Sequence, residues 1–138
     1  MNELRQRVTG GCLCGAIRYE ADQVPFDAGY CHCGMCQKSL GGLFGAWVFF
    51  NNADFRYTTR EPQWFRSSKT VRRGFCPDCG SPITYMPEGV DFTTIWIGTL
   101  DDPAQFEPKA HWHTESKISW VDIHASLPDN GAVFEAED

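Results

Sequence analysis

Seven cysteines, gathered in three short clusters, constrain the fold of this chain more than any other sequence feature. The clusters are Cys12-Leu13-Cys14, Cys31-His32-Cys33-Gly34-Met35-Cys36 and Cys76-Pro77-Asp78-Cys79. Cysteines at these short spacings are typical zinc ligands, because two sulfurs on one tight turn can bind the same ion. The cysteines divide into a set of four and a set of three, and the sequence therefore predicts two zinc ions per chain.

The third cluster supplies half of a tetrahedral zinc site. Gly80 follows Cys79 directly and permits a positive φ, so that backbone N–H groups can point at the sulfurs. Cys12 and Cys14 can supply the other half, because residues i and i+2 of an extended segment face the same way. We predict a closed structural site formed by Cys12, Cys14, Cys76 and Cys79, whose metal binding contributes directly to folding. The spacing leaves other groupings of the cysteines open.

Cys31, Cys33 and Cys36 are the three sulfurs that this grouping leaves over. A structural zinc site has four protein ligands, whereas a catalytic site has three and keeps one position for water or substrate. The odd count therefore favours an open, reactive site on this loop. A histidine could instead close the site and make it structural. The candidates for such a fourth ligand are His32, His111, His113 and His124.

Two other interpretations of the cysteines are weaker. A Cys-x-x-Cys pair can be a redox dithiol, but that motif usually opens a helix in a βαβ unit, which this sequence lacks. A disulfide scaffold fits neither the odd number of cysteines nor the N-terminal segment, which has no apolar core of a secretory signal. We therefore expect a cytoplasmic protein, and no run is long and apolar enough to span a membrane.

Composition predicts one zinc-binding domain over residues 1–138. Hydrophobic residues make up 42% of the chain and charged residues 22%, which is ordinary for a globular domain. The formal net charge is -6, so the chain lacks the basic surface that nucleic-acid binding needs. A local group of basic residues runs from Arg66 to Arg73, and we expect it to be a solvated loop.

Short apolar segments separated by Gly and Pro predict a mainly β fold. Alternation over residues 16–20 is typical of a half-buried strand, and the aromatic run over 43–50 of a strand buried on both faces. Residues 92–100 are rich in β-branched and aromatic side chains, and residues 112–124 suggest one or two more strands. Helical periodicity is weak, with short turns expected after Cys33 and at 102–106, where Asp102 could cap and Pro103 begin the turn.

At these motifs the chain resembles the glutathione-dependent formaldehyde-activating enzyme family, which includes the centromere protein V group. The resemblance covers nearly the whole chain. Its motifs are residues 10–19, residues 31–38 with 45–47 after them, residues 73–81, and residues 98–101 followed by Pro108, His111, Ser116, Lys117 and Trp120.

The resemblance implies an Mss4-like fold of twisted antiparallel sheets. It also implies a structural zinc at Cys12, Cys14, Cys76 and Cys79, and a catalytic zinc at Cys31, Cys33 and Cys36. The founding activity of the family joins glutathione to formaldehyde, formally as a carbon–sulfur lyase working in the synthetic direction. The expected partners are thus a small-molecule thiol and an aldehyde. The sequence contains no feature that specifies which thiol, which aldehyde or which oligomeric state.

Three residues beside the open site are candidates for supporting roles. Lys38 could stabilise a developing alkoxide or bind a substrate carboxylate, and a solvated loop lysine is an equal alternative. Trp47 and Phe49 could form a wall of the pocket, although core packing is the commoner role for each. The main alternative to an enzyme is a non-catalytic zinc module that binds a protein partner.

Overall fold

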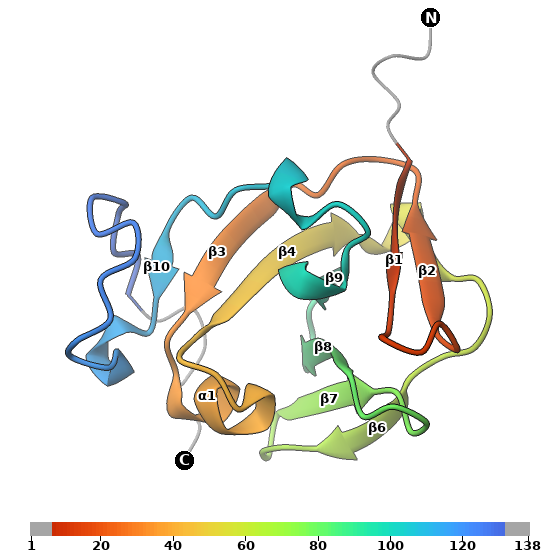
Figure 1. Ribbon diagram of the computed structural model, residues 1–138, viewed down its shortest axis with the longest axis horizontal. Helices are drawn as coiled ribbons and strands as arrows, with labels where there is room; N and C mark the ends of the chain where they lie inside the picture. Colours follow the sequence, from red (N-terminus) through yellow and green to blue (C-terminus); the bar gives the residue numbers. More distant parts are fainter. Residues whose placement is uncertain (1–6, 132–138) are drawn as a thin grey trace, which may run out of the picture.

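The computed structural model describes residues 7–131, which form three small β-sheets and one short α-helix (Figure 1). The first sheet contains the antiparallel strands β1 (Val8–Gly11), β2 (Arg18–Ala21) and β5 (Phe55–Tyr57). The second contains β10 (His111–Trp112), β3 (Asp27–Cys31), β4 (Gly45–Asn51) and β9 (Phe92–Trp96), in that order. The third contains β6 (Gln63–Arg66), β7 (Val71–Phe75) and β8 (Pro82–Pro87).

Helical structure is limited to short segments. The α-helix is α1 (Gly34–Leu40), which begins directly after β3. Four single 3-10 turns complete the described chain: η1 (Asn52–Asp54), η2 (Ile97–Thr99), η3 (Pro103–Gln105) and η4 (Thr114–Ser116). None of the helices within residues 7–131 has the length and apolar character needed to cross a bilayer.

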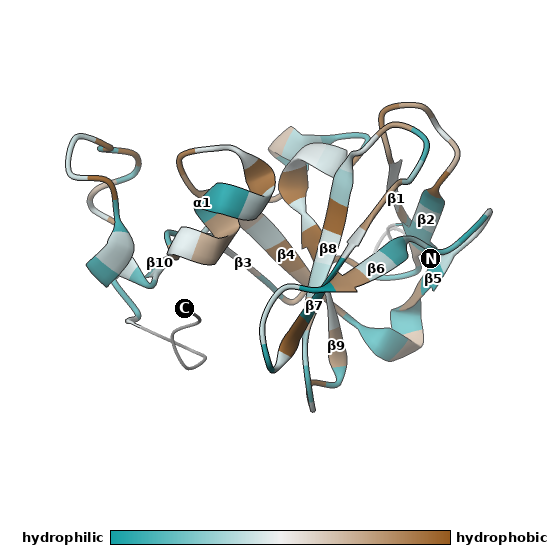
Figure 2. Cartoon of the chain, turned by 90° about the horizontal axis from the view of Figure 1, so that it is seen from below, coloured by the Kyte–Doolittle hydropathy of each residue, from teal (hydrophilic) through white to brown (hydrophobic). Residues whose placement is uncertain are grey.

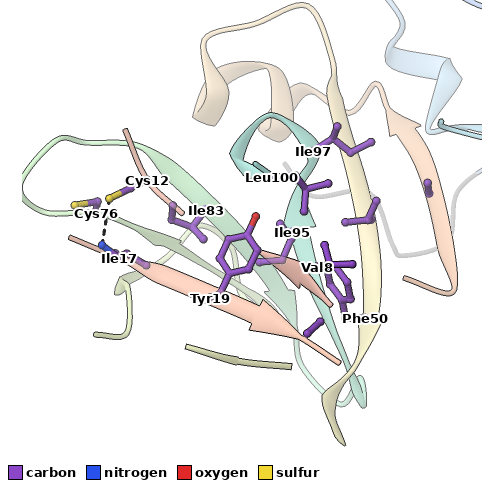
Figure 3. Packing of buried hydrophobic residues seen from close by; sticks show 13 residues of the cluster. Val8, Cys12, Ile17, Tyr19, Phe50, Cys76, Ile83, Ile95, Ile97 and Leu100 are labelled. Carbon is purple, nitrogen blue, oxygen red and sulfur yellow. Dashed lines mark hydrogen bonds between the residues drawn. The ribbon is translucent and has the colours of Figure 1, made fainter. Parts of the chain in front are cut away.

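The largest core cluster receives side chains from all three sheets. Strands β4 and β8 carry many of the most hydrophobic segments of the cartoon (Figure 2). Figure 3 shows Tyr19 of β2, Phe50 of β4 and Ile83 of β8 packed around Ile95 of β9. Because no single sheet of three or four strands could bury both faces, the sheets are stable only when packed together.

A second, more aromatic cluster lies on the opposite face of β4, where Trp47 and Phe49 alternate with Val48 and Phe50 of the first cluster. Trp47 and Phe49 stack there with ring centroids 4.0 Å apart, and Tyr85 stacks on Trp96 at 5.1 Å. The register of β3 and β4 places Gly45 opposite Cys31, and a Cβ on Gly45 would lie only 2.4 Å from the Trp96 ring. Glycine is therefore required where the large indole covers this strand.

The strongest predicted strands are present, with shifted ends. Strand β2 starts two residues later than predicted and keeps the alternating burial, and β4 is buried over most of its length as predicted. The strand predicted over 92–100 ends at Trp96, because the Thr99 hydroxyl donates to the Trp96 carbonyl at 2.8 Å and stabilises a 3-10 turn. Strands β1, β3, β5, β6, β7 and β8 were not predicted.

The prediction of further strands over residues 112–124 is wrong. Only His111 and Trp112 form a strand, and it is parallel to β3. His113 and His124 have φ values of 56° and 45°, in the left-handed region that strands do not adopt. The turn expected after Cys33 is the start of α1. Pro103 begins η3 as predicted, but the Asp102 side chain makes no capping hydrogen bond.

Candidate metal centre

Two loops from different sheets carry the four-cysteine cluster, defined as Cys12, Cys14, Cys76 and Cys79. One loop joins β1 to β2 and the other joins β7 to β8. Each loop is a tight turn closed onto the carbonyl of its first cysteine: Gly15 N–H donates to Cys12 O at 3.2 Å, and Gly80 N–H to Cys76 O at 2.7 Å. Both glycines have a φ near +80°, which explains why glycine follows the second cysteine of each pair.

The four sulfurs are spaced as a tetrahedral thiolate site requires. Their Sγ atoms all lie within 4.8 Å of one another, with 3.6 Å between Cys12 and Cys14 and 3.8 Å between Cys14 and Cys76. A zinc–sulfur bond of about 2.3 Å in a tetrahedral site corresponds to sulfur–sulfur distances of about 3.8 Å. The donor set and its spacing therefore fit one zinc ion. Cys12 and Cys76 are buried, and Figure 3 shows both beside Ile17 at the end of the core.

Hydrogen bonds to two of the sulfurs, those of Cys12 and Cys79, favour their thiolate forms. Ile17 N–H donates to Cys12 Sγ at 3.3 Å (Figure 3). The Ser81 hydroxyl accepts from Leu13 N–H at 3.0 Å, so its hydrogen is available to Cys79 Sγ at 3.1 Å. The hydrogen bond from Ser81 lowers the pKa of Cys79 to about 6. Sequence reasoning did not single out Ser81, although its place directly after the Cys-Gly pair was a usable signal.

The three-cysteine cluster, defined as Cys31, Cys33 and Cys36, lies where β3 passes into α1. Cys31 is the last residue of β3, Cys33 is the N-cap of α1, and Cys36 is the buried residue of the helix. The Cys33 sulfur accepts a hydrogen bond from Cys36 N–H at 3.3 Å, in the manner of a capping side chain. Helix formation thus turns a Cys-x-Cys and a Cys-x-x-Cys spacing into one group of converging sulfurs.

Within residues 7–131 this cluster has three ligand atoms and no fourth. The three Sγ atoms lie within 4.8 Å of one another, and those of Cys31 and Cys36 are 3.4 Å apart. No other ligand atom of residues 7–131 joins the group. Hydrogen bonds from Cys31 and then Cys36 lower the pKa of Cys33, so the cluster stabilises a thiolate at its half-buried member. The set fits a zinc ion with one position left for another ligand.

The two clusters match the sequence pattern of a known family. The family model described as "Glutathione-dependent formaldehyde-activating enzyme" matches residues 7–116, which include all seven cysteines. The chain belongs to this family. The resemblance noted in the sequence is therefore confirmed.

Two individual proteins are similar to this chain, one in sequence and one in fold. A Halomonas elongata protein named "Putative glutathione-dependent formaldehyde-activating enzyme" is 24% identical over 130 residues, covering 87% of this chain and 83% of the relative. The crystal structure of a Rhodobacter sphaeroides protein from a structural genomics programme superimposes with a TM-score of 0.55 at 16% identity. That match covers 88% of this chain and 99% of the other, and it supports the shared fold alone.

One basic residue of this family member is buried against the three-cysteine cluster. Arg73 on β7 is 5% exposed, and its Nη2 lies 3.8 Å from Cys36 Sγ. Its guanidinium carbon also lies 5.4 Å from the centre of the Tyr85 ring. The prediction of a solvated loop is therefore wrong at Arg73, because pairing in β7 turns this side chain inward while Arg72 stays exposed. Alternation along a strand explains the difference.

The histidines lie around the cluster and none completes it within residues 7–131. His32 turns away from the sulfurs, and its Nε2 lies 2.8 Å from Nδ1 of His111. His111 Nε2 in turn lies 3.0 Å from the carbonyl oxygen of His124. Burial and then the neighbouring His111 lower the pKa of His32, which favours the neutral form of its ring. His113 is also buried, and its Nδ1 is 3.4 Å from the Glu115 carboxylate.

The remaining candidates differ in their surroundings. Trp47 and Phe49 belong to the same buried cluster as Cys31 and Cys36, so they pack against the sulfur-bearing segment. Lys38 lies on α1 two residues after Cys36 and is exposed to solvent. The tertiary structure thus brings the two aromatic residues to the cluster and leaves the lysine at the surface beside it.

Proposed function

We propose that this chain is a single-domain zinc enzyme of the carbon–sulfur lyase type. It would join the thiol of glutathione, or of a similar compound, to formaldehyde or another small aldehyde, and would also catalyse the reverse reaction. The observation that carries the proposal is the three-cysteine cluster, in which three converging sulfurs leave one coordination position for a substrate. The family to which the chain belongs supports the choice of thiol and aldehyde.

The reaction needs a thiolate beside a carbonyl carbon. Zinc bound by the cluster would supply Lewis acidity that lowers the pKa of a coordinated substrate thiol. The substrate loses its S–H proton, its sulfur forms a bond to the aldehyde carbon, and the former carbonyl oxygen takes up a proton to become a hydroxyl. In the reverse direction the carbon–sulfur bond breaks, the hydroxyl proton is lost and the thiol leaves.

The residues of the chain would divide the work. Cys31, Cys33 and Cys36 would hold the ion, and the buried Arg73 would offset the negative charge of the Cys36 thiolate. Lys38, on the exposed side of α1, would reach the alkoxide oxygen as negative charge develops on it, or a carboxylate of the thiol substrate. Trp47 and Phe49 would exclude water from the buried side of the cluster.

The four-cysteine cluster would hold a second zinc with a structural role. It joins the loop between β1 and β2 to the loop between β7 and β8, and these loops belong to different sheets. Sheets this small have little hydrophobic area of their own, so metal binding between them would contribute strongly to folding. An Mss4-like fold, with its sheets held by such a site, is part of the same proposal.

Cobalt substitution tests whether the second site is open. We expect two metal ions per chain and a new thiolate-to-cobalt absorption band when glutathione is added to the cobalt protein. Cys33→Ser is the matched control, because it removes a ligand of the three-cysteine cluster and should abolish the new band. A spectrum that glutathione leaves unchanged would contradict the enzyme proposal and favour a closed zinc module that binds a protein partner.

A further inference from the structure

A cavity of about 320 Å³ lies between α1 and the sheet β6-β7-β8. Its walls are mainly apolar and come from five elements: Leu40 of α1, Phe65 of β6, Phe75 of β7, Pro82 of β8 and Trp96 of β9. Small-molecule sites usually have volumes of about 300 to 1,000 Å³ and mostly apolar walls with a few polar groups. The cavity is therefore large enough for a small organic group and far larger than formaldehyde needs.

The cavity shares residues with the three-cysteine cluster. Leu40 and Trp96 pack in the same aromatic cluster as Cys31 and Cys36, and both also line the cavity. Arg73 lies between the two, because its side chain lines the cavity and its Nη2 lies 3.8 Å from Cys36 Sγ. A group bound in the cavity would thus have one end near the reactive cluster and beside a cationic side chain.

The opening of the cavity carries an exposed aromatic side chain. Phe65 lines the cavity and is 46% exposed, so this wall can be reached from solvent. Its ring centroid lies 5.9 Å from that of Phe75, which lines the cavity too. The register shift between β7 and β8 falls at Gly74 and Phe75, in the same wall, and such bulges often reorient side chains beside functional sites.

We infer that this cavity is the subsite for the substituent of the aldehyde, and that the chain accepts aldehydes with an alkyl or aryl group. The inference rests on the proposed function and names its substrate class. The carbonyl end would point toward Arg73 and the cluster, and the apolar end toward Phe65. Sulfur still adds to the carbonyl carbon and a proton to the oxygen, so the product is the hemithioacetal of the larger aldehyde.

Selectivity measurements on the zinc-loaded protein test the inference. Exchange NMR would give kcat/KM for the glutathione reaction with formaldehyde, hexanal and phenylacetaldehyde. Ser39→Phe places a large side chain at the wall of the cavity, and Ser119→Phe adds the same side chain at an exposed position. We expect Ser39→Phe to lower the hexanal-to-formaldehyde ratio at least about tenfold, because each methylene in an apolar pocket contributes measurably to binding. Ser119→Phe should leave the ratio unchanged.

A second variant guards against misfolding of Ser39→Phe, and a binding measurement gives a readout that does not depend on turnover. Phe65→Ala removes the exposed wall of the cavity and should lower the hexanal-to-formaldehyde ratio severalfold. It serves as the test if Ser39→Phe fails to fold. Hexanol, which cannot react, should shift the indole N–H resonance of Trp96, assigned with Trp96→Phe.

The outcomes separate the two proposals. Turnover of formaldehyde without turnover of the larger aldehydes, and without hexanol binding, would overturn the inference and leave the proposed function standing. Failure with every aldehyde would contradict the proposed function, whereas a hexanol-induced shift of Trp96 would still support the cavity as a binding site.

Discussion

The guanidinium Nη2 of Arg73 lies 3.8 Å from the sulfur of Cys36, and both side chains are buried. Arg73 belongs to β7, which leads directly into the loop that carries Cys76 and Cys79. Strand β7 therefore supplies a cation to the three-cysteine cluster, and the loop after it carries two cysteines of the four-cysteine cluster. A buried charge needs such a partner, because an unpaired one would cost several kcal/mol.

Replacing Arg73 should weaken metal binding at the three-cysteine cluster. Arg73→Met keeps an unbranched apolar stem and removes the charge that offsets the Cys36 thiolate. We expect affinity for one of the two zinc ions to fall by about 10- to 100-fold, as is usual when a group that contacts a metal ligand is removed. Competition with a chromophoric chelator measures this. Arg72→Met is the control, since Arg72 is exposed and stacks on Trp64 at 4.0 Å; an equal loss in both variants would refute the pairing role.

Loss of one ligand should have different consequences in the two clusters. Cys33→Ser should remove one zinc per chain and abolish thiol–aldehyde chemistry while the fold remains. Cys79→Ser should prevent folding, because apparent binding energies of structural zinc are about 10–16 kcal/mol and exceed the stability of most small domains. Metal analysis with circular dichroism during thermal unfolding gives both readouts. Full activity in Cys33→Ser would show that the open site is not the reactive one.

Replacing Lys38 should show whether this lysine has a catalytic role or is only a solvated residue of the helix. Lys38→Met should lower kcat/KM at least about tenfold, equivalent to about 1.4 kcal/mol of transition-state stabilisation, with metal content unchanged. Lys69→Met is the matched control, because Lys69 is exposed in the turn between β6 and β7. Steady-state kinetics with both variants decide the question, and identical rates would assign Lys38 to the solvated alternative.

Gly45 should be intolerant of a side chain. A Cβ at this position would lie 2.4 Å from the Trp96 ring and 3.0 Å from Leu40 Cδ1, beside the register partner Cys31. We expect Gly45→Ala to lower the free energy of unfolding by about 1–3 kcal/mol, as overpacking of a core usually does. Denaturant unfolding in excess zinc measures it. Gly98→Ala should cost much less, because a Cβ there meets no atom within 4 Å; equal costs would contradict the packing argument.

The pair formed by Arg18 and Asp101 should contribute stability that acid removes. The Asp101 carboxylate accepts hydrogen bonds from Arg18 Nη1 at 3.0 Å and from the Thr9 hydroxyl at 2.7 Å. These hydrogen bonds lower the pKa of Asp101 below its ordinary value. A lowered folded-state pKa means that the contribution is present above the unfolded-state pKa and is lost as pH falls through the folded-state pKa. Both side chains are at least a third exposed, so we expect less than about 1 kcal/mol from Asp101→Asn at neutral pH.

The measurement for this pair is a difference between variant and parent at each pH. Acid also protonates the cysteines, and the difference cancels that effect. The loss caused by Asp101→Asn should shrink as pH falls below about 4, the ordinary pKa of an aspartate. Asp102→Asn serves as the control, since the Asp102 side chain makes no capping hydrogen bond. A loss that stays constant with pH would rule out the charge pair as its cause.

Local spacing made much of the metal centre predictable. The pairs Cys12–Cys14 and Cys76–Cys79 each lie on one tight turn, and the turn geometry depends only on neighbouring residues and on a following glycine. The helix after Cys33 likewise depends on a local cap. Dividing the seven cysteines into a set of four and a set of three then predicts the two groups that the structure brings together. The apolar run over residues 43–50 was enough to predict β4, because burial of both faces of this strand does not depend on a particular partner.

Distant contacts were not predictable from the sequence, because they depend on which strands pair. Arg73 appears among basic residues that suggest a solvated loop, and only its place in β7 turns it toward Cys36. Residues 112–124 have the composition of strands, yet the left-handed conformation of His113 and His124 ends any strand there. The cavity beside the cluster combines residues from α1 and four strands. The sequence by itself determined which sulfurs could share a metal, since that is a matter of short-range backbone geometry. Only the tertiary structure decided which cation, aromatic walls and cavity surround them, since sheet packing brings those groups together over long sequence separations.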